Sequence, residues 1–464
     1  MGGGGTTVVN ASAYSLIKKT ITDYRDKIGA FYAAVGGLRG AINEDITDVF
    51  KYAESNGKAD IQSRLNKIKF PASPVFRTSR VKPENGLDCE RLLDVFKAHN
   101  IQHIFMNGGN DTMEKLIILQ EFFKNNGYEL HIIGIPKTID NDLLVTDRCP
   151  GYASFAKQVA INTMSLQADM KAFSIPTYGT KHSRKKETAP SQVVVYSGRD
   201  GGWGVAASIM AKVDESAAPH VILTKEGGFS SSKFLDKCQN AFDKYGNLFV
   251  VSAEGAHDGK QFIANYLNVS SSEFDLVFKM HKDPHKNTNM TNSRLGLFLK
   301  LLIEKELKID SNVYKYLKTR EEGPAFLDRN HLEIMSVNDF YDAVAVGEKA
   351  ADLAFGESIP IDNVMVTLAK NIGETGYTKL ENVADIIKGS KAMTKSFSSL
   401  NRTGSNILTD DGMMIDRGLY LDYIGDIIDL NGPNRSEFLR NEDFKLPLKE
   451  IKWTLEKKLL DEYR

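Results

Sequence analysis

Two carboxylates and a lysine, Asp140, Asp142 and Lys137, stand close together in the segment Gly134–Asp142. The segment follows a strand-like run, His131–Ile133, and contains a proline, so we expect the chain to leave a sheet here instead of starting a long helix. A carboxylate pair at a sheet edge can divide its work, because one group accepts a proton while the other holds a metal ion or sets its neighbour's pKa. The alternative is a solvated polar corner with a salt bridge, which is the commoner meaning of an isolated Asp-x-Asp pattern.

A glycine-containing turn, Asn107–Thr112, lies ahead of that segment, between a predicted strand at His103–Met106 and a predicted helix from about Met113 to Asn126. Its glycines allow the backbone to pass close to a ligand, and the start of the helix offers unpaired N–H groups to an anion. Asp111 in this turn either caps the helix or competes with a bound anion, and the local sequence favours neither interpretation.

A second glycine pair, Gly36–Gly37, ends the run Ile28–Val35, which we expect to be a buried strand. Helical periodicity follows from about Ile42 to Ala53. The order of strand, glycine turn and helix presents backbone amides to a phosphate. Because many α/β proteins contain this order, it is a weak indication when taken alone.

Three later strand-like runs each end in a polar or glycine-rich corner. The runs are 193–196, 221–224 and 248–251, and the corners are Ser197–Arg199, Lys225–Gly227 and Ser252–Gly255. Strands that alternate with helices, with polar groups gathered at the strand ends, are typical of open and mostly parallel sheets. We therefore expect an α/β fold with two Rossmann-like lobes, mostly parallel sheets, and the active site in the cleft between the lobes.

The composition is that of an ordinary globular protein, with 42% hydrophobic and 26% charged residues in a chain of 464, long enough for two domains. A net charge of -1 gives no footprint for nucleic acid or for an anionic membrane. No apolar run reaches the length of a membrane span, and the start of the chain lacks the order of a signal peptide. Cys89, Cys149 and Cys238 have no disulfide or zinc spacing, so we expect a cytoplasmic protein.

The expected domain layout has four parts. We predict an N-terminal extension over 1–27, with a flexible glycine lead-in and an amphipathic helix. A first lobe over 28–150, completed by part of 340–400, is followed by a second lobe over 151–339. A C-terminal extension over 400–464 ends with a helix near 446–463. A basic loop at 181–186 is either solvated or reaches a phosphate or a neighbouring subunit.

In order along roughly residues 28 to 375, these motifs resemble the phosphofructokinases, in particular the pyrophosphate-dependent branch. The strongest pieces are the Gly108–Thr112 turn and the later Pro136–Asp142 segment. The remaining pieces are Thr146–Asp147, Pro150–Gly151, Ser154, Gly198–Arg199 with Gly202–Trp203, Glu226, and Phe326–Arg329 with Asp339 and Gly347 after it.

The resemblance implies transfer of a phosphoryl group to the C1 hydroxyl of fructose 6-phosphate, a step of glycolysis, with the donor in the first lobe and the sugar phosphate in the second. It implies that Asp140 is the general base and that Asp142, with Asn110, helps to hold Mg²⁺. A neutral alcohol is a poor nucleophile, and a positioned base typically contributes about 10²–10⁴-fold. The family typically assembles as homodimers or homotetramers.

The same resemblance nominates the groups around both substrates. The transferring phosphoryl needs positive charge near its oxygens, which Arg80, Lys137 and Mg²⁺ would supply. For the donor the nominated residues are Gly36, Gly37, Gly109, Asn110 and Asp111, and for the sugar phosphate they are Thr138, Ser197, Gly198, Arg199, Glu226 and Arg329. An arginine can bind the 6-phosphate with two parallel N–H bonds, while a glutamate accepts from sugar hydroxyls.

The identity of the donor follows from size and charge. In ATP-using relatives the positions of Asp111 and Lys137 are normally both glycine. A carboxylate at Asp111 would crowd and repel the α-phosphate of a nucleotide, whereas Lys137 supplies a cation to the terminal phosphate of a short donor. Both residues therefore point to pyrophosphate, whose exchange is close to balanced, so the reaction is expected to run in both directions.

Several positions depart from the family pattern. Three are single residues: Ser197 stands in place of a methionine, Asp328 in place of a glutamine, and Lys225 in place of a proline. Two are segments: Pro71–Ser73 stands where a Gly-Gly-Thr turn is expected, and 283–287 only loosely resembles the acceptor-side loop. These departures leave two alternatives open: an ATP-dependent 6-phosphofructokinase with an unusual donor pocket, and a catalytically weakened paralogue kept as a regulatory or structural subunit.

Overall fold

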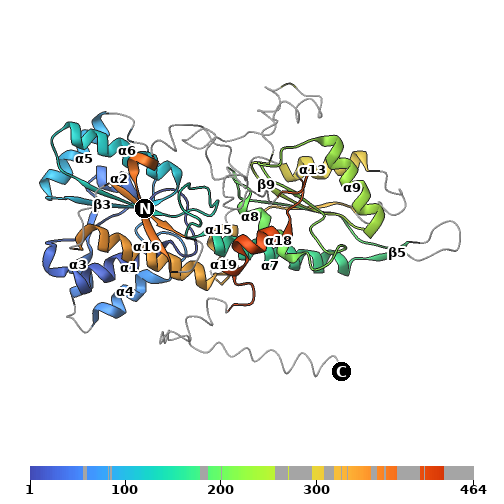
Figure 1. The fold of residues 1–464 in the computed structure, drawn as a ribbon, viewed down its shortest axis with the longest axis horizontal. Coiled ribbons are helices and arrows are strands. Elements are labelled where there is room, and N and C mark those ends of the chain that lie inside the picture. The colour runs from blue at the N-terminus through green and yellow to red at the C-terminus, as the bar shows by residue number, and fades with distance from the viewer. Residues whose placement is uncertain are drawn as a thin grey trace.

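The computed structural model describes residues 1–55, 60–81, 83, 86–177, 186–199, 201–256, 270, 295–307, 318–324, 327–331, 333–356, 363–369, 373–383, 408–411 and 413–432. These residues form two lobes that lie side by side (Figure 1). The predicted basic loop up to Lys185, the segment 283–287 and the predicted helix near 446–463 lie outside the described residues.

The first lobe is built on a four-stranded sheet of order β12-β11-β4-β3. Its strands are β3 (His103–Gly108), β4 (His131–Pro136), β11 (Val364–Leu368) and β12 (Thr375–Lys379), all parallel except the edge strand β12. Successive side chains of β4 face opposite sides of the sheet, so Ile132 joins one core cluster and Ile133 another. Both faces of the sheet are therefore covered, as a parallel sheet requires.

Helices cover the two faces of this sheet. On the Ile132 side lie α5 (Gly86–Ala98) and α6 (Asn110–Asn125), and on the Ile133 side lies α16 (Val337–Phe355). Residues 1–27 belong to this lobe as well: α1 (Val9–Asp23) packs along α16, with Val9 and Ile17 buried, and η1 (Arg25–Lys27) follows it.

Helix α1, in the predicted extension over 1–27, packs closely on α16. A Cβ at Gly347 of α16 would lie 2.2 Å from the carbonyl oxygen of Ser12, so glycine is the residue that lets the two helices approach. The chain then forms a short ribbon of β1 (Tyr32–Ala34) and β2 (Ile46–Asp48), with the helices α2 (Gly37–Ile42), α3 (Val49–Glu54) and α4 (Ile61–Lys69). Among the described residues β1 pairs with β2 alone, in antiparallel orientation, so the strand within the run Ile28–Val35 is not part of the described parallel sheet.

The second lobe holds a fully parallel sheet of order β10-β7-β9-β8. Its strands are β7 (Gln192–Tyr196), β8 (Val221–Leu223), β9 (Phe249–Ala253) and β10 (Arg320–Glu322), and its helices are α7 (Tyr152–Ala172), α8 (Trp203–Ala206), η3 (Ala207–Ala211), α9 (Ser231–Tyr245), α13 (Leu295–Glu306) and the short α15 (Leu327–Asn330). Figure 1 shows α9 and α13 on one side of the sheet and α7 on the other. A separate ribbon joins β5 (Ile175–Thr177) and β6 (Lys186–Thr188).

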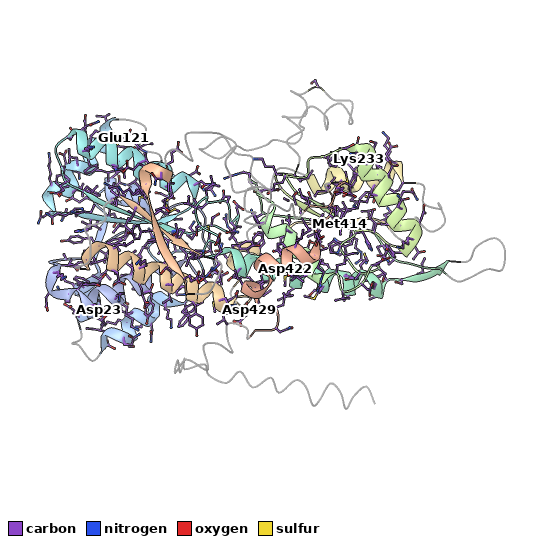
Figure 2. The ribbon with its side chains drawn as sticks, viewed as in Figure 1. Asp23, Glu121, Lys233, Met414, Asp422 and Asp429 are labelled. Carbon is purple, nitrogen blue, oxygen red and sulfur yellow. The ribbon has the colours of Figure 1, made fainter. Side chains whose placement is uncertain are left out.

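Part of the predicted C-terminal extension packs into the second lobe. It contains α18 (Arg417–Tyr420), η4 (Leu421–Gly425) and α19 (Asp426–Ile428), and the Tyr420 hydroxyl lies 2.8 Å from that of Tyr152 on α7. Figure 2 shows Met414, Asp422 and Asp429 along a segment that runs from the second lobe back toward the first.

The predicted α/β class with two Rossmann-like lobes is confirmed by these two mostly parallel sheets. Within the ranges given above, no helix has the length and apolar character needed to cross a membrane.

Candidate active site

The carboxyl ends of β3 and β4 bring the predicted donor and catalytic residues to one edge of the first sheet. Gly108 pairs with Pro136 across the two strands, and the Lys137 N–H donates to the Gly108 carbonyl at 3.0 Å. Gly109 precedes the first turn of α6 and lies against the next loop, since a Cβ there would sit 3.5 Å from the Lys137 carbonyl oxygen. Helix α6 therefore begins beside Lys137, with its unpaired N–H groups near that edge.

Two aspartates follow β4 in a tight loop. The Asp140 N–H donates to the Thr138 hydroxyl at 3.1 Å, and Asn141 has a φ of 52°, a left-handed conformation that asparagine tolerates. The Asn110 side-chain amide donates to Asp142 at 2.7 Å, which ties the start of α6 to this loop. Asp111, the next residue of α6, is half-buried in the same first turn.

Lys137 is buried, with 4% of its surface exposed, and its ammonium donates to the carbonyl oxygens of Gly2 at 3.0 Å and Gly4 at 2.7 Å. Burial, and after it the positive charge of Arg329, lower the pKa of Lys137 to about 8, while the negative charge of Asp140 opposes the shift. Positive charge is therefore concentrated beside the carboxylates.

Arg80 and Arg329 complete this charged cluster. Arg80, an exposed side chain, also contributes to lowering the pKa of Lys137. Burial lowers the pKa of Arg329, with Asp328 and Asp140 acting in the opposite direction. Lys137 and Arg329 both interact electrostatically with Asp140, and Arg80 lies close enough to act on both of these cations. This arrangement suits a polyanionic ligand better than a neutral one.

The N-terminal glycines are part of this cluster, a feature that the sequence reasoning missed when it assigned them to a flexible lead-in. The Gly2 N–H donates to the Asn107 carbonyl at 2.9 Å, and the Thr78 hydroxyl donates to the Gly3 carbonyl at 2.8 Å. A Cβ at Gly4 would lie 2.7 Å from Nη1 of Arg329, so any side chain there would have to displace that guanidinium. The available signal was a run of glycines followed by threonines and a helix, the same pattern as Gly108–Thr112.

Gly36 and Gly37 lie between β1 and α2, in the order of strand, glycine turn and helix that the sequence predicts. The Gly36 N–H donates to the Phe76 carbonyl at 2.8 Å, and a Cβ at Gly37 would lie 2.2 Å from the Met1 carbonyl oxygen. Gly37 also lines an apolar cavity of about 560 Å³ beside β3. The glycine carbonyls that Lys137 reaches belong to Gly2 and Gly4, so the structure gives those residues the closer relation to the charged cluster.

Glu226, which follows β8, lies near the same cluster from the side of the second lobe. Both of its carboxylate oxygens accept from the Gly202 N–H, at 3.0 and 3.1 Å, and burial raises its pKa. A Cβ at the preceding glycine, Gly201, would sit 3.4 Å from the Asp140 carbonyl oxygen and 3.8 Å from Glu226. Gly201 therefore lies close to both the Asp140 loop of the first lobe and Glu226 of the second.

Ser197, Gly198 and Arg199 follow β7 at the end of the second sheet. Gly198 has a φ of 141°, and the Gly255 N–H donates to its carbonyl at 3.2 Å. Asp328 of α15 accepts from the Ser197 N–H at 2.9 Å and from the Ser197 hydroxyl at 3.1 Å. Two of the departures from the family pattern are therefore in contact with each other, beside Arg329.

The described residues contain no group of three or more histidine, cysteine, aspartate or glutamate side chains that could hold a metal ion by themselves. Asp140, Asp142 and the Asn110 side chain supply oxygen donors close to the cationic cluster. Mg²⁺ prefers oxygen ligands, keeps several waters, and is often bound through one or two carboxylates together with substrate phosphates. The donor set therefore fits Mg²⁺ held jointly with a phosphate ligand.

Carboxylates beside a cluster of cations at the carboxyl ends of parallel strands are typical of proteins that bind and transfer phosphoryl groups. The sequence pattern of the phosphofructokinase family matches residues 1–291, and the chain belongs to that family.

Individual relatives agree with this assignment. The chain is 28% identical to a pyrophosphate–fructose 6-phosphate 1-phosphotransferase of Halomonas elongata, over 85% of each chain. It is 30% identical to the enzyme of the same name from Xanthomonas campestris pv. campestris, over 81% of this chain and 79% of the relative. The crystal structure of the pyrophosphate-dependent phosphofructokinase of Nitrosospira multiformis matches the fold with a TM-score of 0.69 and 28% identity, over 93% of this chain and 91% of that one.

Proposed function

We propose that this chain transfers a phosphoryl group reversibly from pyrophosphate to the C1 hydroxyl of fructose 6-phosphate, giving fructose 1,6-bisphosphate and phosphate. The observation that carries the proposal is the buried ammonium of Lys137 beside Asp140 at the carboxyl ends of β3 and β4. The names of the relatives that match most of this chain support the same reaction.

Asp140 is the general base in this proposal. The sugar hydroxyl loses its proton to the Asp140 carboxylate as its oxygen attacks phosphorus, and the bond from phosphorus to the leaving phosphate breaks. Two hydrogen bonds hold the loop around Asp140. The Asp140 N–H donates to the Thr138 hydroxyl, and the Asn110 side chain donates to Asp142. Such positioning is what general-base catalysis requires of its side chain.

The donor pyrophosphate binds on the first lobe. Lys137, Arg80 and Arg329 bring positive charge to its oxygens, and the beginning of α6 at Gly109, Asn110 and Asp111 faces it. Gly36 and Gly37 belong to the donor side in this proposal, and the N-terminal glycine segment joins them, since Gly2 and Gly4 contact Lys137 directly. Asp111 excludes the longer nucleotide because its carboxylate occupies space and repels an α-phosphate.

The acceptor binds from the second lobe. Glu226 accepts from the sugar hydroxyls, Arg199 and Arg329 hold the 6-phosphate, and Thr138, Ser197 and Gly198 complete the surface around the sugar. The closeness of Gly201 to both the Asp140 carbonyl and Glu226 supports this placement, because it puts the sugar-binding acid across the cleft from the base.

Mg²⁺ is the metal in this proposal, and Asp142 with Asn110 would hold it on the donor side. When bound, it neutralises charge on the phosphate oxygens. The remaining proposals are assembly as a homodimer or homotetramer and a place in glycolysis in the cytoplasm.

A parallel assay tests the proposal against its alternatives. Purified protein receives fructose 6-phosphate and Mg²⁺ with either pyrophosphate or ATP, and fructose 1,6-bisphosphate is measured. We expect product with pyrophosphate only, and we expect fructose 6-phosphate when the bisphosphate and phosphate are supplied instead. Product with ATP alone would contradict the donor assignment, and no product with either donor would favour the non-catalytic paralogue.

A further inference from the structure

Asp339, in the first turn of α16, has a buried carboxylate that faces the start of α7. Its oxygens accept from the Gly151 N–H at 2.7 Å, the Ser154 N–H at 3.0 Å and the Ser154 hydroxyl at 2.5 Å. A carboxylate that accepts several N–H bonds at a helix start is strongly held, because it satisfies donors that have no partner within the helix. Asp339 therefore fixes Gly151 relative to α16.

Gly151 is directly linked to the loop that carries Asp140. Thr138 forms a parallel bridge with Gly151, and its N–H donates to the Pro150 carbonyl at 3.3 Å. The Thr138 hydroxyl in turn accepts from the Asp140 N–H at 3.1 Å. A short chain of hydrogen bonds thus runs from Asp339 through Gly151 and Thr138 to the backbone of Asp140.

A second carboxylate of α16 holds the same stretch of chain. Asp342, one turn after Asp339, forms a buried ion pair with Arg148, in which Nη2 of Arg148 donates to Oδ1 at 2.7 Å. The same stretch of chain is also held by β11, whose Leu368 N–H donates to the Thr146 hydroxyl at 2.9 Å. Residues 146–151 are therefore anchored to α16 and β11 of the first lobe, immediately before α7 enters the second lobe.

We infer that Asp339 is a positioning residue for the proposed phosphoryl transfer: through Gly151 and Thr138 it fixes the place of the Asp140 carboxylate relative to the donor groups of the first lobe. The predicted effect on kcat rests on the proposed function. The predicted effect on the structure around Asp140 can be measured without any turnover. Asp339 touches neither substrate. Its effect is on the geometry of Asp140, where a displacement of about 1 Å can cost about 10²-fold in rate.

The first test is hydrogen exchange across residues 137–143 in Asp339→Asn, in the absence of substrates. In asparagine an NH₂ group replaces one of the two carboxylate oxygens. That donor then faces the N–H of either Gly151 or Ser154, which loses its acceptor. We expect exchange at the Thr138 and Asp140 amides to accelerate by at least about 10-fold, since a buried donor is left without its acceptor. Ser154→Ala removes the hydroxyl's bond to Asp339 and the bond that the hydroxyl accepts from the Ser336 N–H, but it keeps both backbone N–H bonds to Asp339. A smaller change of about 2- to 10-fold is therefore expected.

The matched control is Asp352→Asn on the same helix. Asp352 accepts from the Tyr24 hydroxyl at 2.7 Å and pairs with Lys19 at 3.2 Å, so its environment is that of α1 and not that of Gly151. Exchange over residues 137–143 should be unchanged in this variant. Unchanged exchange in Asp339→Asn as well would overturn the inference, and if that variant fails to fold, unchanged exchange in Ser154→Ala would do so.

The kinetic test uses the pyrophosphate assay. For Asp339→Asn we expect kcat to fall about 10- to 100-fold while KM for both substrates stays within about threefold, because positioning of the base acts on the transition state and not on binding. A purely structural role would change neither parameter once the folded fraction is corrected for, and that result would overturn the inference. If the wild-type protein shows no turnover, the proposed function fails, and the exchange measurement still decides the inference.

Discussion

Asp328 accepts both the backbone N–H and the hydroxyl of Ser197, which joins the end of β7 to the short helix α15. Each residue departs from the family pattern, and the contact explains why they occur together: the hydroxyl satisfies a carboxylate that has only 1% of its surface exposed. The pair holds the end of β7, just ahead of Arg199, against the segment that carries Arg329. We therefore regard the two departures as one replacement of an anchoring contact and not as two losses.

The Asp328 carboxyl gives stability a predictable dependence on pH. Burial raises its pKa from 3.8 to about 6, so between these values the folded protein holds a proton that the unfolded chain has released. The free energy of unfolding should therefore fall as pH rises from about 4 to about 6, by up to about 3 kcal/mol from this group. Urea unfolding of the wild type and Asp328→Asn across this range measures the difference. A constant difference between the two proteins would show that Asp328 does not titrate as described.

Lys137 predicts an alkaline limit for pyrophosphate binding. Its pKa is lowered to about 8, so the ammonium is charged below that pH and neutral above it in the free protein. We expect kcat/KM for pyrophosphate to fall by up to about tenfold per pH unit above about pH 8. Lys137→Arg keeps its charge throughout, so its profile should lack this limb even if its overall activity is lower. An identical limb in both proteins would assign the titration to another group.

Gly4 tests the role of the N-terminal segment. In Gly4→Ala the new Cβ would lie 2.7 Å from Nη1 of Arg329 and would displace either the guanidinium or the glycine carbonyl that Lys137 contacts. We expect KM for pyrophosphate to rise by about tenfold or more, which corresponds to the loss of one charged hydrogen bond. Gly29→Ala is the control, because a Cβ there has nothing within 4 Å among the described atoms. Equal kinetics for the two variants would remove the glycine segment from the donor site.

Asp111→Gly tests how the nucleotide is excluded. Removing the carboxylate from the first turn of α6 relieves both its bulk and its charge, so measurable turnover with ATP is the expected gain. The ratio of kcat/KM for ATP to that for pyrophosphate, compared with the wild type, is the quantity to measure. If ATP use stays at zero, Asp111 is not the barrier, and Lys137 becomes the residue to examine.

The sequence is a good guide where a local pattern determines the structure. The ends of β3 and β4 are recognisable because each apolar run passes into glycine or proline and then into polar residues, and the parallel register brings Gly108 and Pro136 side by side. The α/β class follows from the same alternation of strands and helices. Both features depend on neighbours in the chain.

The sequence is a poor guide where a contact joins distant segments. A run of glycines has no apolar periodicity, so Gly2 and Gly4 look the same whether they are mobile or packed against Lys137. The run Ile28–Val35 has the composition of a buried strand, yet the strand β1 covers only Tyr32–Ala34, and it pairs with the following segment. The contact between Ser197 and Asp328 joins two segments that are far apart in the sequence. Neither residue, taken by itself, indicates that it contacts the other.

The central claim is that Asp140 removes the proton from the sugar hydroxyl in a pyrophosphate-dependent reaction, and the most direct test is kcat of Asp140→Ala with saturating pyrophosphate, fructose 6-phosphate and Mg²⁺. Its thermal unfolding is measured alongside to establish that the variant is folded. We predict a loss of about 10²–10⁴-fold or more in kcat, because no other group would accept the proton at that position. A folded Asp140→Ala protein that retains most of its kcat would contradict the account.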